Sequence, residues 1–378
     1  MPQALRRASA AAAIALAAGC LCAPAHAHGD ESAAAAHLPQ RVALLQRAQA
    51  ELERGDSTQA LDDFERAAMM LHAADAELGL IRAAMQDGQY RRALAFCAHT
   101  AGEHTDDADG AALYAWLLRI GGQGELAARV LAQARANAPD DAVAAAVEAA
   151  FGTTPPVASG VLLQPLHRMA PWPAGSPSAV PVTARFVSNA VLVDDGAAAL
   201  APLPALARVM RARVWVRNGL GQAAEVDVDA ADAALAARGL ARLTLRRALP
   251  VGASRQAAGR APFAGSPGFA MQFGDAGTPA WPMLTQGFLG TLASDGEARK
   301  VGFASTPGAA ILDAHGALVG ITLAATDGTA TWLPLAAAAT SPAASPPPPR
   351  AGLALTAPDE IYEAGLGRAL QVLVEDPR

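Results

Sequence analysis

Apolar residues in the first part of the chain recur at helical spacing, and glycines interrupt them at a regular interval. Gly55, Gly88 and Gly122 are 33 and 34 residues apart. Apolar positions at helical spacing occupy residues 47–54 and 57–70, on either side of the first glycine, as two packed helices require. Because glycine permits a tight turn, this pattern predicts a helical hairpin that is repeated three times. An alanine follows each glycine by five residues, at Ala60, Ala93 and Ala127.

Residues 152–337 have a different pattern, in which short β-prone runs alternate with turn signals such as Asn218-Gly219 and Asp327-Gly328. Many short strands at this spacing are typical of an all-β sandwich or of two barrels. The predicted fold class is therefore multidomain, α then β. The predicted strands cover residues 160–164, 182–187, 190–193, 213–216, 225–228, 240–245, 269–273, 286–292, 300–304, 309–312, 318–323 and 331–335.

Composition narrows the possible functions. The 378 residues are 52% hydrophobic and 17% charged, enough for two or three domains that each bury a core. The formal charge is −6 and only 4% of residues are aromatic, which argues against nucleic-acid binding, since that needs a basic face and often stacking platforms. The three cysteines form no CxxC pair and the histidines no cluster along the chain, so the sequence suggests no metal site and no cofactor. Cys97 occupies an apolar helical position and is expected to be a buried, inert thiol.

Residues 1–27 are predicted to be a secretory signal peptide. Arg6 and Arg7 precede a small apolar run, and Ala25-His26-Ala27 supplies the small residues of a cleavage site. Residues 28–36 would then form a flexible N-terminal tail. No later stretch is long and apolar enough to span a membrane, so we expect a protein exported to the periplasm or secreted.

A second interpretation concerns Cys20. The segment Ala17-Ala18-Gly19-Cys20 resembles the lipobox of bacterial lipoproteins, in which the cysteine is acylated after cleavage. The family's usual leucine is displaced here by one position, to Leu16, which makes a lipid anchor the less favoured alternative. Cleavage after Ala27 would instead leave His28 at the N-terminus. An amine and an imidazole together could chelate copper there, but the favoured interpretation of residues 28–32 is a frayed tail.

The repeat at residues 37–151 resembles the tetratricopeptide repeat, a helix-turn-helix unit of 34 residues. Ala48 and Ala115 stand where that family has a small residue in the first helix, and Pro139 stands where a repeat ends. The second repeat departs from the pattern, with Ile81 and Thr105 at the corresponding positions. The resemblance implies a concave surface that holds a peptide or a protein partner. The alternative is a helical collar that only packs on the next domain.

The β region resembles the trypsin-like proteases of the two-barrel chymotrypsin type, and especially the bacterial periplasmic high-temperature-requirement proteases. Residues 312–321, Leu-Asp-Ala-His-Gly-Ala-Leu-Val-Gly-Ile, match without a gap the segment that follows the nucleophile in that family. Counting back from this segment places Pro307 at the nucleophile, with Gly308 and Ala309 on the oxyanion side. The same resemblance places Gly239 at the triad acid and, after the hairpin of residues 189–196, Pro204 at the histidine.

These assignments imply a domain without catalytic residues, because a serine triad needs a hydroxyl, an imidazole and a carboxylate. The sequence has no histidine between His167 and His315. The alternative is an active serine endopeptidase of periplasmic protein quality control, with a diverged triad in which one of these histidines activates Ser305 or Ser188. We interpret His167 as a solvated loop residue and His315 as a turn residue. The favoured function is a non-catalytic pseudoprotease that acts as a protein- or peptide-binding scaffold or an assembly factor in the cell envelope. The partner would be held by the helical repeats, and the vacant protease cleft is a second candidate binding surface.

The C-terminal part begins with a Pro-rich linker at residues 338–352, which includes four consecutive prolines at 346–349. Residues 353–378 are predicted to form a helix and then a strand. They resemble the helix and first strand with which periplasmic trypsin-like domains often begin. Two interpretations remain open: this segment docks back onto the barrel, or it is the remnant of a second copy.

Overall fold

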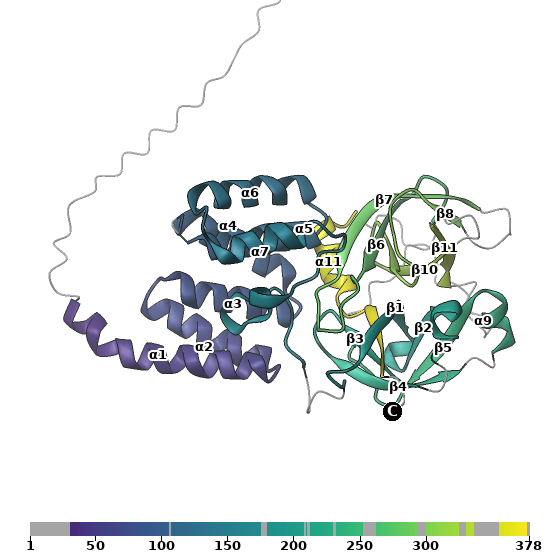
Figure 1. Ribbon diagram of the computed structural model, residues 1–378, viewed down its shortest axis with the longest axis horizontal. Helices are drawn as coiled ribbons and strands as arrows, with labels where there is room; N and C mark the ends of the chain where they lie inside the picture. Colours follow the sequence, from purple (N-terminus) through teal and green to yellow (C-terminus); the bar gives the residue numbers. More distant parts are fainter. Residues whose placement is uncertain are drawn as a thin grey trace, which may run out of the picture.

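The computed structural model describes residues 31–375 with gaps at 106, 175–179, 208, 210–211, 230–231, 252–261, 293–298, 325–329 and 336–354. The predicted signal peptide, Cys20, His28 and the proline run of the linker lie outside the described residues. Helices form the N-terminal half of the described chain and strands form the C-terminal half (Figure 1). Within the described residues, no helix combines the length and apolar character that crossing a membrane requires.

Three helical hairpins and a closing helix form the N-terminal region. The three turn glycines, Gly55, Gly88 and Gly122, all have a positive φ, of 81°, 83° and 87°. This is the backbone conformation that glycine adopts without strain, so the spacing of the glycines located the turns. The helices are α1 (Glu31–Glu53), α2 (Ser57–Met70), α3 (Ala74–Gln86), α4 (Tyr90–Glu103), α5 (Ala108–Ile120), α6 (Gly124–Asn137) and α7 (Ala142–Ala150).

Two sequence expectations require correction. Helix α1 begins at Glu31, inside the segment 28–36 that was expected to be a flexible tail. The run Ala33-Ala34-Ala35-Ala36 explains the difference, because alanine has the highest helix propensity. The segment 160–164, expected to be a strand, forms a 3₁₀ helix at Gly160–Leu163, which begins at a glycine with a φ of 56°.

The β region consists of two closed, six-stranded antiparallel barrels, the arrangement of a trypsin-like two-barrel domain. Barrel 1 has the strand order β1-β12-β3-β4-β5-β2, and barrel 2 has the order β10-β11-β8-β7-β6-β9. The strands of barrel 1 are β1 (Arg185–Val193), β2 (Ala198–Pro202), β3 (Arg213–Asn218), β4 (Ala223–Asp229), β5 (Leu240–Leu245) and β12 (Ala369–Glu375). Those of barrel 2 are β6 (Pro267–Gln272), β7 (Met283–Leu292), β8 (Arg299–Val301), β9 (Ala310–Asp313), β10 (Leu318–Ala324) and β11 (Ala330–Pro334).

The C-terminal strand β12 completes barrel 1. It pairs with β1 on one side and with β3 on the other, with Leu370 opposite both Ala190 and Asn218. The two interpretations of the C-terminal segment are thereby resolved, since it docks back onto the barrel. The side chain of Gln371 accepts a hydrogen bond from Arg217 Nε at 3.0 Å and donates one to the carbonyl of Ala276 at 2.9 Å, so β12 also contacts the β6–β7 connection of barrel 2.

The helical repeats pack on the β region through their turns. Gly55 lies against Pro173 and Ala174, Gly88 lies against Leu220, and Gly122 lies against the carbonyl of Leu284. One continuous cluster of buried side chains extends from the helices into the barrels.

Helix α11 (Pro358–Gly365), which precedes β12, lies between the helical region and the barrels (Figure 1). Its Tyr362 packs on Tyr90 of α4, with ring centroids 4.2 Å apart, and donates a hydrogen bond to the carbonyl of Pro282 at 2.8 Å. The collar role is therefore part of the architecture, and it leaves the other helix surfaces available.

Candidate functional site

The positions assigned to the triad histidine and acid lie next to each other in barrel 1. Strand β2 leads into the short helix α8 (Leu203–Leu206), which is anchored by the buried Leu206 and carries Pro204 on its exposed side. Gly239 precedes β5, and its carbonyl accepts a hydrogen bond from the backbone N–H of Leu203 at 2.8 Å. The two positions therefore meet, and neither a proline nor a glycine side chain can accept or hold a proton.

The position assigned to the nucleophile is a turn in barrel 2. Pro307 is exposed and has no backbone N–H, so this turn lacks one donor that an oxyanion hole could use. The next two backbone N–H groups are engaged inside the barrel. That of Gly308 donates to the carbonyl of Thr322 at 2.8 Å, and that of Ala309 donates to Thr322 Oγ1 at 2.8 Å. Neither N–H group is therefore free to donate a hydrogen bond to a substrate carbonyl.

An amide network joins this turn to barrel 1. Asn189, in β1, accepts a hydrogen bond from the backbone N–H of Phe273 at 2.7 Å and donates one to Thr306 Oγ1 at 3.0 Å. Gln272 accepts from the backbone N–H of Thr306 at 2.6 Å. A Cβ on Gly308 would clash with the carbonyl of Asn189, so the turn is held tightly against β1. The junction of the barrels is thus packed with uncharged hydrogen-bonding groups.

The two histidines considered as displaced bases have other surroundings. His167 ends a short 3₁₀ helix (Pro165–His167), is partly buried, and places Nδ1 2.8 Å from Asp109 Oδ2 of helix α5. It is therefore not the solvated loop residue that we expected, because the repeats pack over it. Burial raises the pKa of Asp109, while the neighbouring His167 acts in the opposite direction. His315 lies in the turn between β9 and β10, as expected, and its backbone N–H donates a hydrogen bond to Asp313 Oδ1 at 2.8 Å.

The two candidate serines also differ from each other. Ser188 Oγ donates to the carbonyl of Asn189 at 2.9 Å and is buried in β1. Ser305 Oγ is buried and has no hydrogen-bond partner among the described residues. Ser305 is therefore the serine to test for residual reactivity.

A groove of about 330 Å³ crosses the repeats between α4, α5 and α6. Small and apolar side chains form most of its wall, and Tyr114 provides the one aromatic ring among its lining residues. Gly102 lies on the wall with open space around its Cα, so the groove is not blocked at this point. A surface of this kind is suited to an extended or helical peptide with small apolar side chains. The α4 wall consists of Ala98, Ala101, Gly102 and Thr105.

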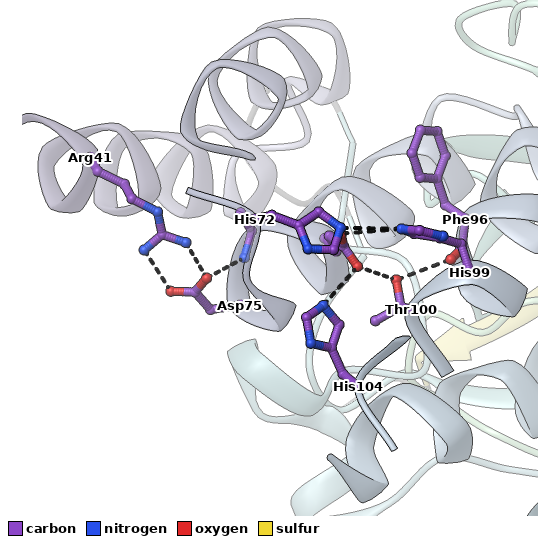
Figure 2. A network of polar contacts seen from close by, with 9 residues as sticks. Arg41, His72, Asp75, Phe96, His99, Thr100 and His104 are labelled. Atoms are coloured by element: carbon purple, nitrogen blue, oxygen red, sulfur yellow. Dashed lines mark hydrogen bonds and ion pairs between the residues drawn. The ribbon is translucent and has the colours of Figure 1, made fainter. Parts of the chain in front are cut away.

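The repeats also bring together four residues, from two stretches of the sequence, that were not expected to form a cluster. His72, Glu77 and His99 place one ligand atom each within 4.8 Å of one another, and His104 lies beside them (Figure 2). The positions of these residues relative to the repeat turn could have predicted the cluster. In an antiparallel hairpin centred on Gly88, residues equally far from the turn reach the same height along their helices. His72 and His104 are equidistant from Gly88, and so are Glu77 and His99.

Comparisons with known proteins give structural neighbours only. No protein-family model matches the sequence, and no curated protein matches it either. Similar structures include PcrH in complex with the chaperone binding region of PopB, at 22% identity over 30% of this chain and 94% of that chain, with a TM-score of 0.28.

Two further neighbours are protease structures. The MamO protease domain from Magnetospirillum magneticum is 15% identical over 41% of this chain and 87% of that chain, with a TM-score of 0.31. An HtrA-type protease, AlgW, solved with a decapeptide, is 18% identical over 39% of this chain and 46% of that chain, with a TM-score of 0.30. The tetratricopeptide-like helical hairpins followed by a trypsin-like two-barrel domain, expected from the sequence, are confirmed as the fold of this chain.

Proposed function

We propose that this protein is a non-catalytic pseudoprotease of the cell envelope that binds a peptide or a protein segment, as a scaffold or assembly factor. One observation carries the proposal: the three positions that the resemblance assigns to the triad hold Pro204, Gly239 and Pro307. A hydrolase of this class needs a nucleophile, a base and an orienting acid. Prolines and glycine supply none of these groups.

The surroundings of the nucleophile turn support the same conclusion. Even without a triad, a preorganised oxyanion hole retains part of the catalysis in enzymes of this class. Here Pro307 has no N–H to contribute, and the N–H groups of Gly308 and Ala309 are satisfied by Thr322. Hydrolysis would require these bonds to break first.

The groove between α4, α5 and α6 is the better supported binding surface. Protease clefts often bind peptides by adding them to the edge of a sheet. Both barrels are closed, so every described strand is already paired on two sides. The repeat groove offers about 330 Å³ with small side chains on its walls, and binding there does not depend on a free strand edge.

The location in the cell envelope rests on the predicted signal peptide at residues 1–27. Cleavage after Ala27 would give a soluble periplasmic or secreted protein, whereas acylation of Cys20 would give a lipoprotein. The intact mass of the mature protein distinguishes these two outcomes, because acylation adds the mass of the lipid and leaves residues 20–27 in place.

The catalytic part of the proposal is tested with a fluorophosphonate probe and a casein substrate. The mature protein is expected to show neither labelling nor cleavage, because no serine is activated. Ser305→Ala is the matched control, since Ser305 Oγ is a buried hydroxyl group with no hydrogen-bond partner among the described residues. Labelling that Ser305→Ala abolishes would overturn the proposal and favour the serine endopeptidase with a diverged triad.

The binding part is tested with a displayed peptide library selected on the mature chain. At Gly102 an added Cβ meets no atom within 4 Å, so Gly102→Arg can start a long side chain at the wall of the groove, and we expect it to weaken the binding of selected peptides at least about tenfold. Ala132→Arg adds the same charge at an exposed position of α6 outside the groove lining and should leave binding unchanged. Equal binding by both variants and the unmodified chain would exclude the groove as the binding surface.

A further inference from the structure

His72, His99 and His104, which are labelled in Figure 2, each lie within 4 Å of the carboxylate of Glu77. The cluster lies at the end of the second hairpin opposite the Gly88 turn. His72 comes from the connection between α2 and α3, and Glu77 lies in the first turn of α3. His99 lies near the end of α4, and His104 follows directly after that helix. The four residues therefore come from both helices of the hairpin and from the connection to the preceding repeat.

The distances in this cluster are short. His72 Nε2 lies 2.7 Å from Glu77 Oε1 and 3.2 Å from His99 Nε2. His99 Nε2 lies 3.8 Å from the same carboxylate oxygen. His104 Nε2 lies 3.5 Å from Glu77 Oε2. Three imidazole nitrogens thus converge on one carboxylate.

The buried carboxylate of Glu77 is the reason to expect a cation in this cluster. The side chain of Glu77 is only 6% exposed, and each of its ion pairs among the described residues is with an imidazole. A buried carboxylate is costly unless a positive charge compensates it. His104 Nε2 is itself buried and has no hydrogen-bond partner among the described residues, although it faces the carboxylate.

The spacing fits a tetrahedral metal ion. Four ligands at about 2.0–2.1 Å from a zinc ion lie about 3.3–3.4 Å from one another. The distances of 2.7 to 3.8 Å among His72 Nε2, His99 Nε2 and Glu77 Oε1 bracket this value. His104 Nε2 faces the other carboxylate oxygen, at 3.5 Å from Glu77 Oε2, so its ring must rotate for it to become the fourth ligand. Thr100 Oγ1 donates a hydrogen bond to Glu77 Oε2 at 2.7 Å, and a contact of this kind orients a metal-binding carboxylate.

We propose that His72, Glu77, His99 and His104 form a binding site for one divalent transition-metal ion of the zinc class. Imidazole ligands favour such ions over Mg²⁺ and Ca²⁺, which prefer oxygen. The side chains of His72 and His99 are 57% and 47% exposed, so an ion can enter from solvent and exchange. A bound ion would fasten the α2–α3 connection to the end of α4 and so fix the first repeat relative to the second.

The test uses the full mature chain, freed of metal with a chelator and titrated with Zn²⁺ in a calorimeter. Zinc is the probe because His28, if it becomes the N-terminus, would compete for copper. We expect one ion per chain and a rise in melting temperature on binding. Replacing zinc by Co²⁺ should give the visible absorption of tetrahedral cobalt.

The variants His72→Ala and His99→Ala change exposed side chains, so the metal-free chain should keep its far-UV circular dichroism. Each is expected to weaken zinc binding at least about tenfold, since even the loss of an outer-shell partner commonly costs that much. His315→Ala, in the turn of barrel 2, is the matched control and should bind as the unmodified chain does.

Two results would overturn the proposal. In the first, the metal-free chain takes up no zinc, and the cluster is then a hydrogen-bonded network only. In the second, His72→Ala and His99→Ala bind zinc as tightly as His315→Ala does, and the ion then sits elsewhere. Both readouts measure metal, so they are independent of the peptide-binding test.

Discussion

Barrel 2 is built from six strands that follow one another in the chain, β6 to β11, whereas barrel 1 uses β1 to β5 and takes its sixth strand from the C-terminus. Read from β6, barrel 2 has the ring order first, second, third, sixth, fifth, fourth. Barrel 1 has the same ring order when β12 is counted as its first strand. The two barrels therefore share one topology, and barrel 1 is circularly permuted relative to barrel 2.

Strand pairing and core packing therefore define the barrel, while the order of the strands along the chain is secondary. Loop-closure entropy rises only about 0.6 kcal/mol for each doubling of loop length. A strand recruited from the far end of the chain therefore costs little more than a local one. The side chains of Leu370, Val372 and Val374 in β12 are completely buried in the core of barrel 1, and their burial offsets that cost.

The largest expected effect comes from deleting residues 367–378, which removes β12 and leaves α11. The deletion unpairs β1 and β3 along their whole contact and opens the core of barrel 1. We expect a chain that loses its cooperative unfolding transition or aggregates, measured by thermal circular dichroism and light scattering. Deleting only residues 376–378 is the control and should preserve the transition. A transition retained by the longer deletion would show that barrel 1 closes without β12.

Two core substitutions compare the barrels directly. Leu370→Ala in β12 and Ile311→Ala in β9 each empty a completely buried site. Each should lower the free energy of unfolding, measured in urea titrations, by about 2–5 kcal/mol, because buried apolar contacts are lost and a cavity remains. The value within this range depends on how far the surrounding core closes the cavity. Thr244→Ala, exposed on β5, should change it by less than about 0.5 kcal/mol. If Leu370→Ala resembled Thr244→Ala instead, β12 would not be a core strand in solution.

A smaller effect concerns Tyr362 in α11, the helix that precedes β12. Its hydroxyl group donates a hydrogen bond to the carbonyl of Pro282, directly before β7 of barrel 2. Burial raises the pKa of Tyr362 well above its usual value, and Tyr90 adds to this. Its contribution to stability is therefore complete below pH of about 10 and falls as the pH rises, since the unfolded chain then ionises more readily. Tyr362→Phe should cost about 1 kcal/mol at pH 7 through the lost hydrogen bond.

The same substitution removes an ionisation penalty of about 1.4 kcal/mol per pH unit above pH 10. Urea titrations at pH 7 and pH 11 should therefore find the variant less stable than the unmodified chain at the lower pH and about equal to it at the higher pH. A gap that stays constant with pH would mean that Tyr362 is not buried from solvent.

Local structure was easier to predict from the sequence than long-range contacts between strands. The turns at Gly55, Gly88 and Gly122 were predictable because a positive φ is a local requirement that one residue type meets. The docking of β12 stayed open because strand pairing is a long-range choice, and the apolar residues of a strand that is buried on both faces do not specify its partner. The 3₁₀ helix at Gly160–Leu163 was missed because a short apolar run has no distinct period.

The helical hairpins, the all-β character of the second region and the residue types at the positions matched to the triad could all be predicted from the order of residues along the chain. The closure of barrel 1 by the C-terminal strand, the contact of His167 with Asp109, and the convergence of three histidines on Glu77 became visible only in three dimensions. The difference comes from the range of the interactions. Backbone conformation and periodic burial depend on neighbours in the chain, whereas ligand sets and strand partners depend on how distant helices and strands pack.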